Sequence, residues 1–416
     1  MEHNIKVEEE RLMRKQNKVT FFVTFLILMS SLYFANDFVN LTILSETRPL
    51  GEDVTAMVLE YPVEIDNSQL SKISFDVIAN RLKLNGFGEI KNRTITNVYA
   101  NNIPETTNEA KNGRFVIIEL FPEDINAETT YKVTDKYGIT TAYDYNLEYT
   151  VIQKDNLLSV EGSIIAPKTI VGTYKKNPIS DQFISSVYES PLGHKLPYSF
   201  FIPENYNPEE EYPLIVFLHG IGARGNNQMP LKANKGATVW ASDEIQSQYP
   251  AFVLAPQCPL DSAWTKMFNN DFFTPTIHLE MVYDLVIKLL EEYNIDVNRI
   301  YGTGLSMGGF GIWALSISHP DFFAALVPVC GGADTSKAKY LVDLPIWTFH
   351  AEDDPLVDVN LTRNMVRTLK DLGGNIKYTE FEKGVVSPPL VPSAHASWIF
   401  AYNNYRMIEW VFSQSR

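Results

Sequence analysis

The chain has 416 residues, of which 45% are hydrophobic and 20% charged, and its 50 acidic and 35 basic residues give a net charge of −15. This length predicts roughly two or three domains that each bury a core, the apolar fraction excludes a mainly disordered chain, and the negative charge gives no electrostatic reason to bind nucleic acid. Two cysteines without a C-x-x-C pair exclude a disulfide framework and argue against a structural zinc site.

The N-terminus has the pattern of an export segment. Residues 19–36 carry no charge, and the ten residues before them contain four basic side chains. An apolar run of ~20 residues spans a bilayer, and basic residues stay on the cytoplasmic side. We therefore expect residues 1–37 to form a cytoplasmic n-region with a signal peptide or signal anchor, so that the remaining chain is extracytoplasmic, either secreted or anchored to the membrane. Whether the segment is cleaved stays open.

Residues 38–165 consist of short alternating runs that are typical of strands. Examples are residues 94–99, 115–120 and 143–149, which are rich in β-branched and aromatic side chains and separated by Asn, Gly or Pro. Such a series predicts an immunoglobulin-like β-sandwich. The polar, proline-containing stretch 166–185 is expected to be a linker.

Residues 186–416 show a different pattern, in which apolar strand-like runs alternate with amphipathic helical stretches. This pattern predicts an α/β domain with a mainly parallel sheet flanked by helices. The predicted strands are 213–218, 251–255, 300–303, 325–329 and 346–350. The predicted helices are 276–293, 306–318, 359–372 and 403–414. Gly373-Gly374 is a natural C-terminal stop for the third helix.

The stretch Gly304-Leu305-Ser306-Met307-Gly308 matches the G-x-S-x-G pattern between a predicted strand and a helix rich in small residues. In a nucleophile elbow the serine occupies a strained turn with its Oγ exposed, and the flanking glycines avoid clashes. A helix start with Ser306 as a simple N-cap is the alternative. The strand–turn–helix context favours the elbow, so Ser306 is the predicted nucleophile.

An activated serine needs a base, and in this type of site the chain order is serine, acid, histidine. Three histidines follow Ser306. His319 ends the elbow helix, and the acids beside His350 come after it in the chain. Only His395 follows an acid-bearing strand end, in a loop before the last helix. We therefore predict His395 as the base and interpret His319 and His350 as structural residues.

The acid is expected in the turn 350–355, just past a predicted strand. A buried carboxylate there would fix the histidine tautomer and stabilise the imidazolium that forms during catalysis. The spacing from the strand does not separate Asp353 from Asp354. Whichever carboxylate is not used is expected to lie in a surface turn.

The oxyanion hole is expected to combine the backbone N–H of Met307 with that of Ile221, which follows an early strand. His219 and Gly220, at the end of that strand, and the loop residue Trp264 are candidates for the substrate pocket.

Residues 220–225 also match the dinucleotide fingerprint G-x-G-x-x-G after a strand. A dinucleotide site needs a helix that opens at once, and residues 226–230 are a poor helix start. We therefore expect no organic cofactor, and nothing in the proposed chemistry requires a metal.

Taken together, these motifs resemble the bacterial carboxylesterases with an N-terminal immunoglobulin-like domain, a branch of the α/β-hydrolases near the polyhydroxybutyrate depolymerase and feruloyl esterase group. The resemblance covers residues 50–414 and is specific because several motifs agree. They are residues 196–206, 217–220, 255–259, 304–309, 330–332 and 349–355.

The resemblance implies an α/β-hydrolase domain and a serine carboxylic-ester hydrolase that forms an acyl-enzyme, with a small-molecule or polymer-attached ester as substrate. It also implies that Asp354 is the acid, because the family pattern places the catalytic Asp four residues after the histidine of the strand end. Cys258 and Cys330 fall near the catalytic face, where two buried thiols are favoured over a disulfide.

Two other classes of protein compete with this interpretation. A prolyl-oligopeptidase-like serine peptidase would use the same residues, but such enzymes usually carry a gating domain, and no repeat here suggests a propeller blade. A surface adhesin with an inactive hydrolase domain is disfavoured by three intact triad residue types in the right order. The acyl and alcohol specificity, the role of the sandwich and the oligomeric state stay open.

Overall fold

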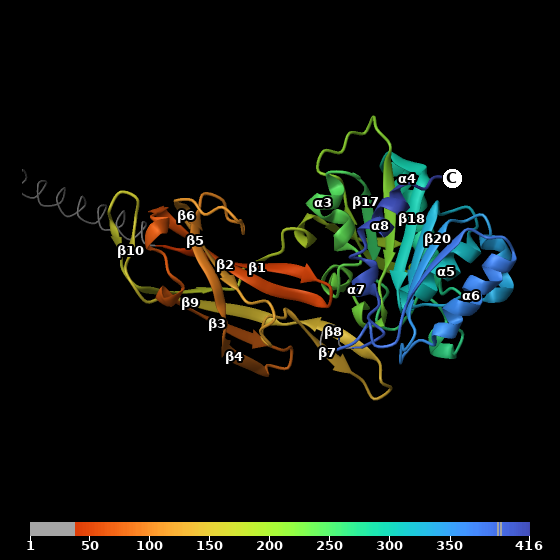
Figure 1. Ribbon diagram of the computed structural model, residues 1–416, viewed down its shortest axis with the longest axis horizontal. Coiled ribbons are helices and arrows are strands. Elements are labelled where there is room, and N and C mark those ends of the chain that lie inside the picture. The colour runs from red at the N-terminus through yellow and green to blue at the C-terminus, as the bar shows by residue number, and fades with distance from the viewer. Residues whose placement is uncertain (1–37, 389–390, 392) are drawn as a thin grey trace, which may run out of the picture.

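The computed structural model describes residues 38–388, 391 and 393–416, which form an all-β part and an α/β part (Figure 1). The predicted export segment, residues 1–37, lies outside the described residues. Within the described residues, no helix has the length and apolar character needed to cross a membrane.

The all-β part is a sandwich of two sheets with the strand orders β13-β1-β2-β6-β5 and β12-β9-β3-β4. Buried apolar residues alternate along the strands, as in β3 with Phe75, Val77 and Ala79, and those of both sheets form one core. The strands of the first sheet are β1 (Asn40–Arg48), β2 (Gly51–Ile65), β5 (Ile95–Asn101), β6 (Gly113–Leu120) and β13 (Lys175–Lys176). Those of the second are β3 (Phe75–Leu82), β4 (Gly88–Asn92), β9 (Asn146–Gln153) and β12 (Lys168–Gly172). A short ribbon adds β10 (Leu157–Leu158) and β11 (Ile164–Ile165).

The structure differs from the sequence-based expectation at the stretch 166–185, which is not a free linker. It contributes β12 to one sheet, where the buried Ile170 packs into the sandwich core, and β13 to the other. Its end, from Ile184, already begins the first strand of the α/β sheet. The two parts are therefore joined by chain that is partly paired in strands, with residues 177–183 between β13 and β14.

The run 143–149, expected to be one strand, is divided at Tyr145 between two strands. Its first part ends β8 (Thr140–Asp144), which pairs with β7 (Thr130–Thr134), and its second part starts β9. The backbone N–H of Tyr145 donates to the carbonyl of Thr129 at 2.9 Å and closes the base of the β7–β8 hairpin. This hairpin leaves the sandwich and reaches the α/β part (Figure 1).

The α/β part is built on an eight-stranded sheet with the order β14-β15-β17-β16-β18-β19-β20-β21. From β17 to β21 in this order all neighbouring strands are parallel, and β15 is antiparallel to both of its neighbours, β14 and β17. This arrangement is consistent with the expected α/β-hydrolase architecture. The strands are β14 (Ile184–Glu189), β15 (Lys195–Phe201), β16 (Tyr212–Leu218), β17 (Phe252–Pro256), β18 (Ile295–Leu305), β19 (Ala325–Val329), β20 (Ile346–Ala351) and β21 (Ile376–Phe381).

Helices cover both faces of this sheet. Buried residues of α4, α5 and α6 form the core on one face, and those of α3, α7 and α8 form the core on the other. The helices are α2 (Met229–Lys232), α3 (Asp243–Gln246), α4 (Ile277–Glu292), α5 (Met307–Ser318), α6 (Val359–Asp371), α7 (Trp398–Ala401) and α8 (Tyr405–Phe412). The four predicted helices correspond to α4, α5, α6 and α8.

The topology brings the candidate residues to one edge of the sheet. Ser306 follows β18, Asp354 follows β20, and the predicted oxyanion loop follows β16. These strands are parallel, so their carboxyl ends meet at the same edge, where open α/β sheets bind ligands.

Candidate active site

Ser306 lies in a strained turn between β18 and α5. Its φ of 54° and ψ of −121° are unusual for a residue with a side chain. The turn is tight: a Cβ on Gly304 would lie 2.4 Å from the carbonyl oxygen of Gly308, and one on Gly308 would lie 1.9 Å from that of Leu218. The Ser306 side chain makes no capping hydrogen bond to α5, so the simple N-cap alternative does not describe it.

The Ser306 hydroxyl contacts His395, and His395 in turn contacts Asp354. Ser306 Oγ lies 2.8 Å from His395 Nε2, and His395 Nδ1 lies 2.7 Å from Asp354 Oδ2. Since the carboxylate only accepts, Nδ1 carries the ring proton and Nε2 is free to accept from the serine. This arrangement can deprotonate the hydroxyl as it attacks an electrophile. The structure thus brings the three predicted residues together, while their catalytic roles stay predictions.

Asp354 is held as a carboxylate inside the protein. Its side chain is fully buried, and Oδ1 accepts from the backbone N–H groups of Leu356 at 2.8 Å and Val357 at 3.0 Å. Burial acts to raise the pKa of Asp354, but the hydrogen bonds from His350 and His395, together with that from Val357, outweigh it and hold the pKa well below its usual range. The carboxylate is therefore ionised across the working range of pH.

Asp353, the other carboxylate that the spacing left open, turns away from His395. Its Oδ2 accepts from the backbone N–H of Gly384 at 3.0 Å. Of the two candidates, only Asp354 contacts the predicted base.

His350 contacts the same carboxylate, which the sequence analysis did not foresee. Its Nε2 lies 3.1 Å from Asp354 Oδ2 and 3.1 Å from the carbonyl oxygen of Val357, so Nε2 carries a proton and donates. Its Nδ1 lies 2.8 Å from Thr362 Oγ1, and the ring is fully buried. The four-residue spacing from His350 to Asp354 across a strand-end turn is the signal that would have suggested the contact.

The two predicted oxyanion donors lie at the first residues of helical turns beside Ser306. Within the described part of the chain, the N–H groups of Ile221 and Met307 have no hydrogen-bond acceptor. Ile221 begins the single turn η4 (Ile221–Ala223), and Met307 begins α5. Both residues line the same cavity as Ser306. Two unpaired N–H groups beside a nucleophile are what a developing oxyanion requires.

Two of the three predicted pocket residues are not on the pocket wall. His219 and Trp264 are fully buried, whereas Gly220 lines the cavity. His219 Nδ1 donates to the carbonyl of Gly220 at 2.7 Å, its Nε2 accepts from the N–H of Cys258 at 3.0 Å, and Trp264 donates to the His219 carbonyl at 3.0 Å. Burial lowers the pKa of His219 to about 4, so the ring is neutral. These side chains turn inward and support the oxyanion loop from behind.

The cavity at Ser306 and His395 has a volume of about 580 Å³ and is lined by both parts of the protein. Its α/β wall is mostly apolar and includes Met267, Phe272, Phe310, Leu361 and Trp398. Its other wall is the β7–β8 hairpin, with Lys132, Gly138, Ile139, Thr140 and Ala142. No sequence pattern indicated that the sandwich reaches the site.

The two cysteines are buried free thiols, as the sequence favoured. The Cys330 sulfur, an Asp354 oxygen and a His395 nitrogen lie within 4.8 Å of one another, a set that offers three metal ligands. Burial and the neighbouring Asp354 raise the pKa of the Cys330 thiol well above its usual value. The thiol is therefore protonated, and a protonated thiol is a poor metal ligand.

Comparison with known proteins gives matches for both parts of the chain. Residues 40–166 match the family model of the esterase immunoglobulin-like N-terminal domain. The crystal structure of a thermostable esterase is 42% identical, with a TM-score of 0.85, and the match covers 90% of this chain and 99% of that one.

Curated relatives match a smaller segment. Poly(3-hydroxyalkanoate) depolymerase C of Paucimonas lemoignei is 26% identical over 180 residues, which are 42% of this chain and 37% of the depolymerase. The probable feruloyl esterase C of Aspergillus oryzae is 27% identical over 136 residues, which are 32% of this chain and 46% of that protein. The chain thus spans less than half the length of either relative.

Proposed function

The chain belongs to the esterases that carry an immunoglobulin-like N-terminal domain, and on that premise we propose that it is a serine carboxylesterase that works through an acyl-enzyme. The observation that carries the proposal is the position of His395, within 2.8 Å of Ser306 Oγ and 2.7 Å of Asp354 Oδ2. The resemblance inferred from the sequence is confirmed at the level of this family.

In the proposed acylation step, Ser306 Oγ attacks the carbonyl carbon of the ester while His395 Nε2 takes its proton. The carbonyl π electrons move to the oxygen, and the N–H groups of Ile221 and Met307 stabilise the resulting oxyanion. Asp354 stabilises the imidazolium. When the tetrahedral intermediate collapses, His395 gives its proton to the leaving alcohol, and the acyl group remains on Ser306.

Deacylation repeats this chemistry with water. His395 takes a proton from water as the oxygen attacks the acyl carbon, and a second oxyanion forms on the same two N–H groups. Collapse breaks the bond to Ser306 Oγ, His395 returns its proton to that oxygen, and the carboxylic acid leaves. Every proton passes through His395, so the proposed cycle needs no metal or organic cofactor.

The proposed substrate is an ester with an apolar acyl or aryl group, because apolar and aromatic side chains dominate the α/β wall of the cavity. The names of the depolymerase and feruloyl esterase relatives support an ester as the substrate, and an ester within or attached to a polymer is one kind of substrate that we include in the proposal. We further propose an extracytoplasmic location, which rests on the sequence of residues 1–37. Membership in an esterase family disfavours the serine peptidase alternative.

The test is hydrolysis of p-nitrophenyl esters from acetyl to long acyl chains, with a prolyl-peptide anilide in parallel and Ser306→Ala as the control. We expect turnover of esters, none of the anilide, and loss of ester turnover in Ser306→Ala with an unchanged melting temperature. Full activity of Ser306→Ala would overturn the assignment of the nucleophile. Activity on the anilide alone would assign the protein to the peptidases.

A further inference from the structure

We propose that the immunoglobulin-like domain is a positioning element of the oxyanion hole, which holds the Ile221 turn in place through the β7–β8 hairpin and the carboxylate of Asp144. The inference rests on the proposed function, because it takes the Ile221 N–H as an oxyanion donor. It assigns to the sandwich a role in the chemical step, in addition to the wall that it contributes to the cavity.

The hairpin packs directly on the turn that carries Ile221. Ala142 of β8 is buried in a small cluster with Ala223 of η4 and Met229 of α2. The carbonyl oxygen of Thr140 lies 3.8 Å from the point that a Cβ on Gly222 would occupy. Each of the last two residues of η4 is therefore covered by a residue of β8, so a shift of the hairpin is transmitted to the turn.

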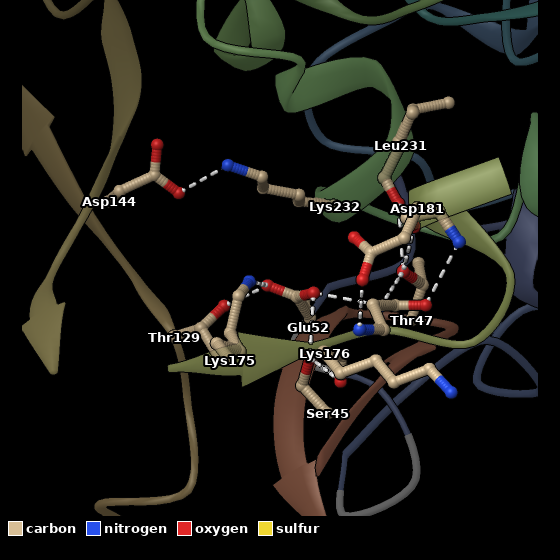
Figure 2. A network of polar contacts seen from close by, with 12 residues as sticks. Ser45, Thr47, Glu52, Thr129, Asp144, Lys175, Lys176, Asp181, Leu231 and Lys232 are labelled. Atoms are coloured by element: carbon tan, nitrogen blue, oxygen red, sulfur yellow. Dashed lines mark hydrogen bonds and ion pairs between the residues drawn. The ribbon is translucent and has the colours of Figure 1, made fainter. Parts of the chain in front are cut away.

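Asp144, at the end of β8, binds the segment that follows this turn at two points. Lys232 Nζ lies 2.7 Å from Asp144 Oδ1, and Asn227 Nδ2 donates to Asp144 Oδ2 at 3.3 Å. Figure 2 shows Lys232 extending toward Asp144 across the space between the two parts. The side chains of Lys232 and Asp144 are 16% and 38% exposed, so the ion pair is shielded from solvent mainly at its lysine end. A single carboxylate thus links both ends of residues 227–232 to the sandwich.

A second anchor holds the same segment from the other side. Thr47 of β1 donates to the carbonyl of Leu231 at 2.8 Å (Figure 2). Asn177 Nδ2 lies 3.3 Å from the Thr47 hydroxyl. Ser180 also lies within 3.3 Å of Thr47. The last turn of α2 is therefore tied to the sandwich through its backbone as well as through Lys232.

The buried carboxylate of Glu52 joins the two anchors. It accepts from Asn177 at 2.8 Å, and so fixes the residue that contacts Thr47. It also accepts from Thr129 at 2.5 Å, directly before β7, and pairs with Lys175 of β13. Burial acts to raise the pKa of Glu52, but Lys175 and the hydrogen bonds from Thr129 and Asn177 outweigh it and lower the pKa. An ionised Glu52 thus holds both Thr129, at the base of the hairpin, and Asn177, which contacts Thr47.

The Ile221 turn is held by the α/β part as well as by the hairpin. η4 is a single turn without a side-chain cap, in a loop that runs from β16 to α2. An oxyanion donor works only when it already points at the developing charge, and an error of ~1 Å costs on the order of a hundredfold in rate. On the α/β side, Arg224 donates to the carbonyls of Ile221 and Leu260. Gln257 donates to the carbonyl of Ala223 at 2.9 Å. The hairpin supplies the support on the opposite side.

The test uses the variants Asp144→Asn and Ala142→Leu in the full chain. The matched control is Asp76→Asn. It removes a comparable ion pair elsewhere on the sandwich, in which Lys154 Nζ lies 2.9 Å from Asp76 Oδ1. The measurements are kcat and KM for acetyl and long-chain p-nitrophenyl esters, and the inhibition constant of a short trifluoromethyl ketone. This ketone adds to the serine as a hemiketal whose oxyanion occupies the oxyanion hole.

We expect kcat to fall roughly tenfold in Ala142→Leu and about threefold in Asp144→Asn, since complete loss of a donor costs ~10²–10³. KM should stay within about twofold, the loss should be equal for short and long acyl chains, and the ketone should bind more weakly by the same factor as kcat falls. Asp76→Asn should match the wild type. If Ala142→Leu does not fold, Lys232→Met replaces it and should reproduce Asp144→Asn.

A loss confined to long acyl chains, with unchanged ketone binding, would overturn the inference and leave the hairpin as a pocket wall. Wild-type kcat and ketone binding in both Asp144→Asn and Lys232→Met would overturn it as well. Ser306→Ala is assayed in the same series: if that variant hydrolyses esters, the proposed function itself has failed. If Ser306→Ala is inactive while the hairpin variants behave as the wild type, only the positioning role has failed.

Discussion

His350 Nε2 lies 3.1 Å from the oxygen of Asp354 that also contacts His395 Nδ1 at 2.7 Å. Two histidines thus share one carboxylate oxygen, one on the strand that precedes the acid and one in the loop before α7. The ring of His350 is fixed in turn by Thr362. The carboxylate is therefore oriented from behind before it orients His395.

This relationship predicts that His350 is a positioning residue. Removing its ring in His350→Ala should lower kcat by roughly tenfold or more, because Asp354 loses a donor and gains freedom to rotate. KM should change little. His350→Gln retains an N–H donor and should recover part of the loss. The comparison of kcat between the two variants checks this, and equal activity of His350→Ala and wild type would contradict it.

The two neighbouring carboxylates should differ sharply. Asp354→Asn should lower kcat by roughly ten-thousandfold, because an amide favours the wrong tautomer of His395. Asp353→Asn should remain near wild-type activity, since Asp353 binds the N–H of Gly384 and not His395. Steady-state kinetics of both variants at neutral pH makes the comparison. A larger loss in Asp353→Asn would mean that the acid has been assigned to the wrong carboxylate.

His219 should make stability depend on pH in the acid range. Its pKa is lowered by burial from 6.5 to about 4, so between these values the unfolded chain binds more protons than the folded one. Stability therefore rises with pH across this window, by on the order of 3 kcal/mol in total. Chemical unfolding of wild type and His219→Asn between pH 4 and 7 measures the effect. The slope should be smaller in the variant, and an unchanged slope would refute the assignment.

Asp53 should give a dependence of the opposite sign. Burial raises the pKa of Asp53 to about 7, with Glu128 and Glu123 adding to the rise and Arg48 opposing it. Between pH 4 and 7 the folded state then binds more protons than the unfolded chain, so stability falls as pH rises. Asp53→Asn should remove this slope and stabilise the protein at pH 8 but not at pH 4. The melting temperatures of the variant and the wild type at pH 4 and pH 8 test this, and a destabilised variant at pH 8 would contradict the prediction.

The sequence predicted the interior of the α/β sheet better than its edges. Strands such as β16 and β19 are buried along their whole length, so each shows as a continuous apolar run. β14 and β21 are largely exposed or half-buried, which leaves no such run to recognise. The split at Tyr145 was missed because local alternation reports a strand but does not report which sheet the strand joins.

For the site, the G-x-S-x-G pattern between a strand and a helix singles out Ser306, and chain order then singles out His395, since topology brings strand ends together. The separation of Asp353 from Asp354 depends on which way one turn points its side chains, and spacing does not contain that information. His219 was expected in the pocket because it lies at a strand end, and Trp264 because it lies in a loop. Their side chains instead turn into the core, which only the packed structure reveals.

The connection between the two parts affects both the cleavage of the native protein by proteases and its thermal unfolding. Residues 168–172 and 175–176 are strands of the sandwich, and β14 starts at Ile184. Between them, Asn177, Ser180 and Phe183 are buried, so there is little slack chain for a protease to cut. Limited proteolysis of the native protein should therefore release no intact catalytic fragment. Because Thr47 and Asp144 also tie the sandwich to α2, we expect heating to melt both parts in one transition rather than two.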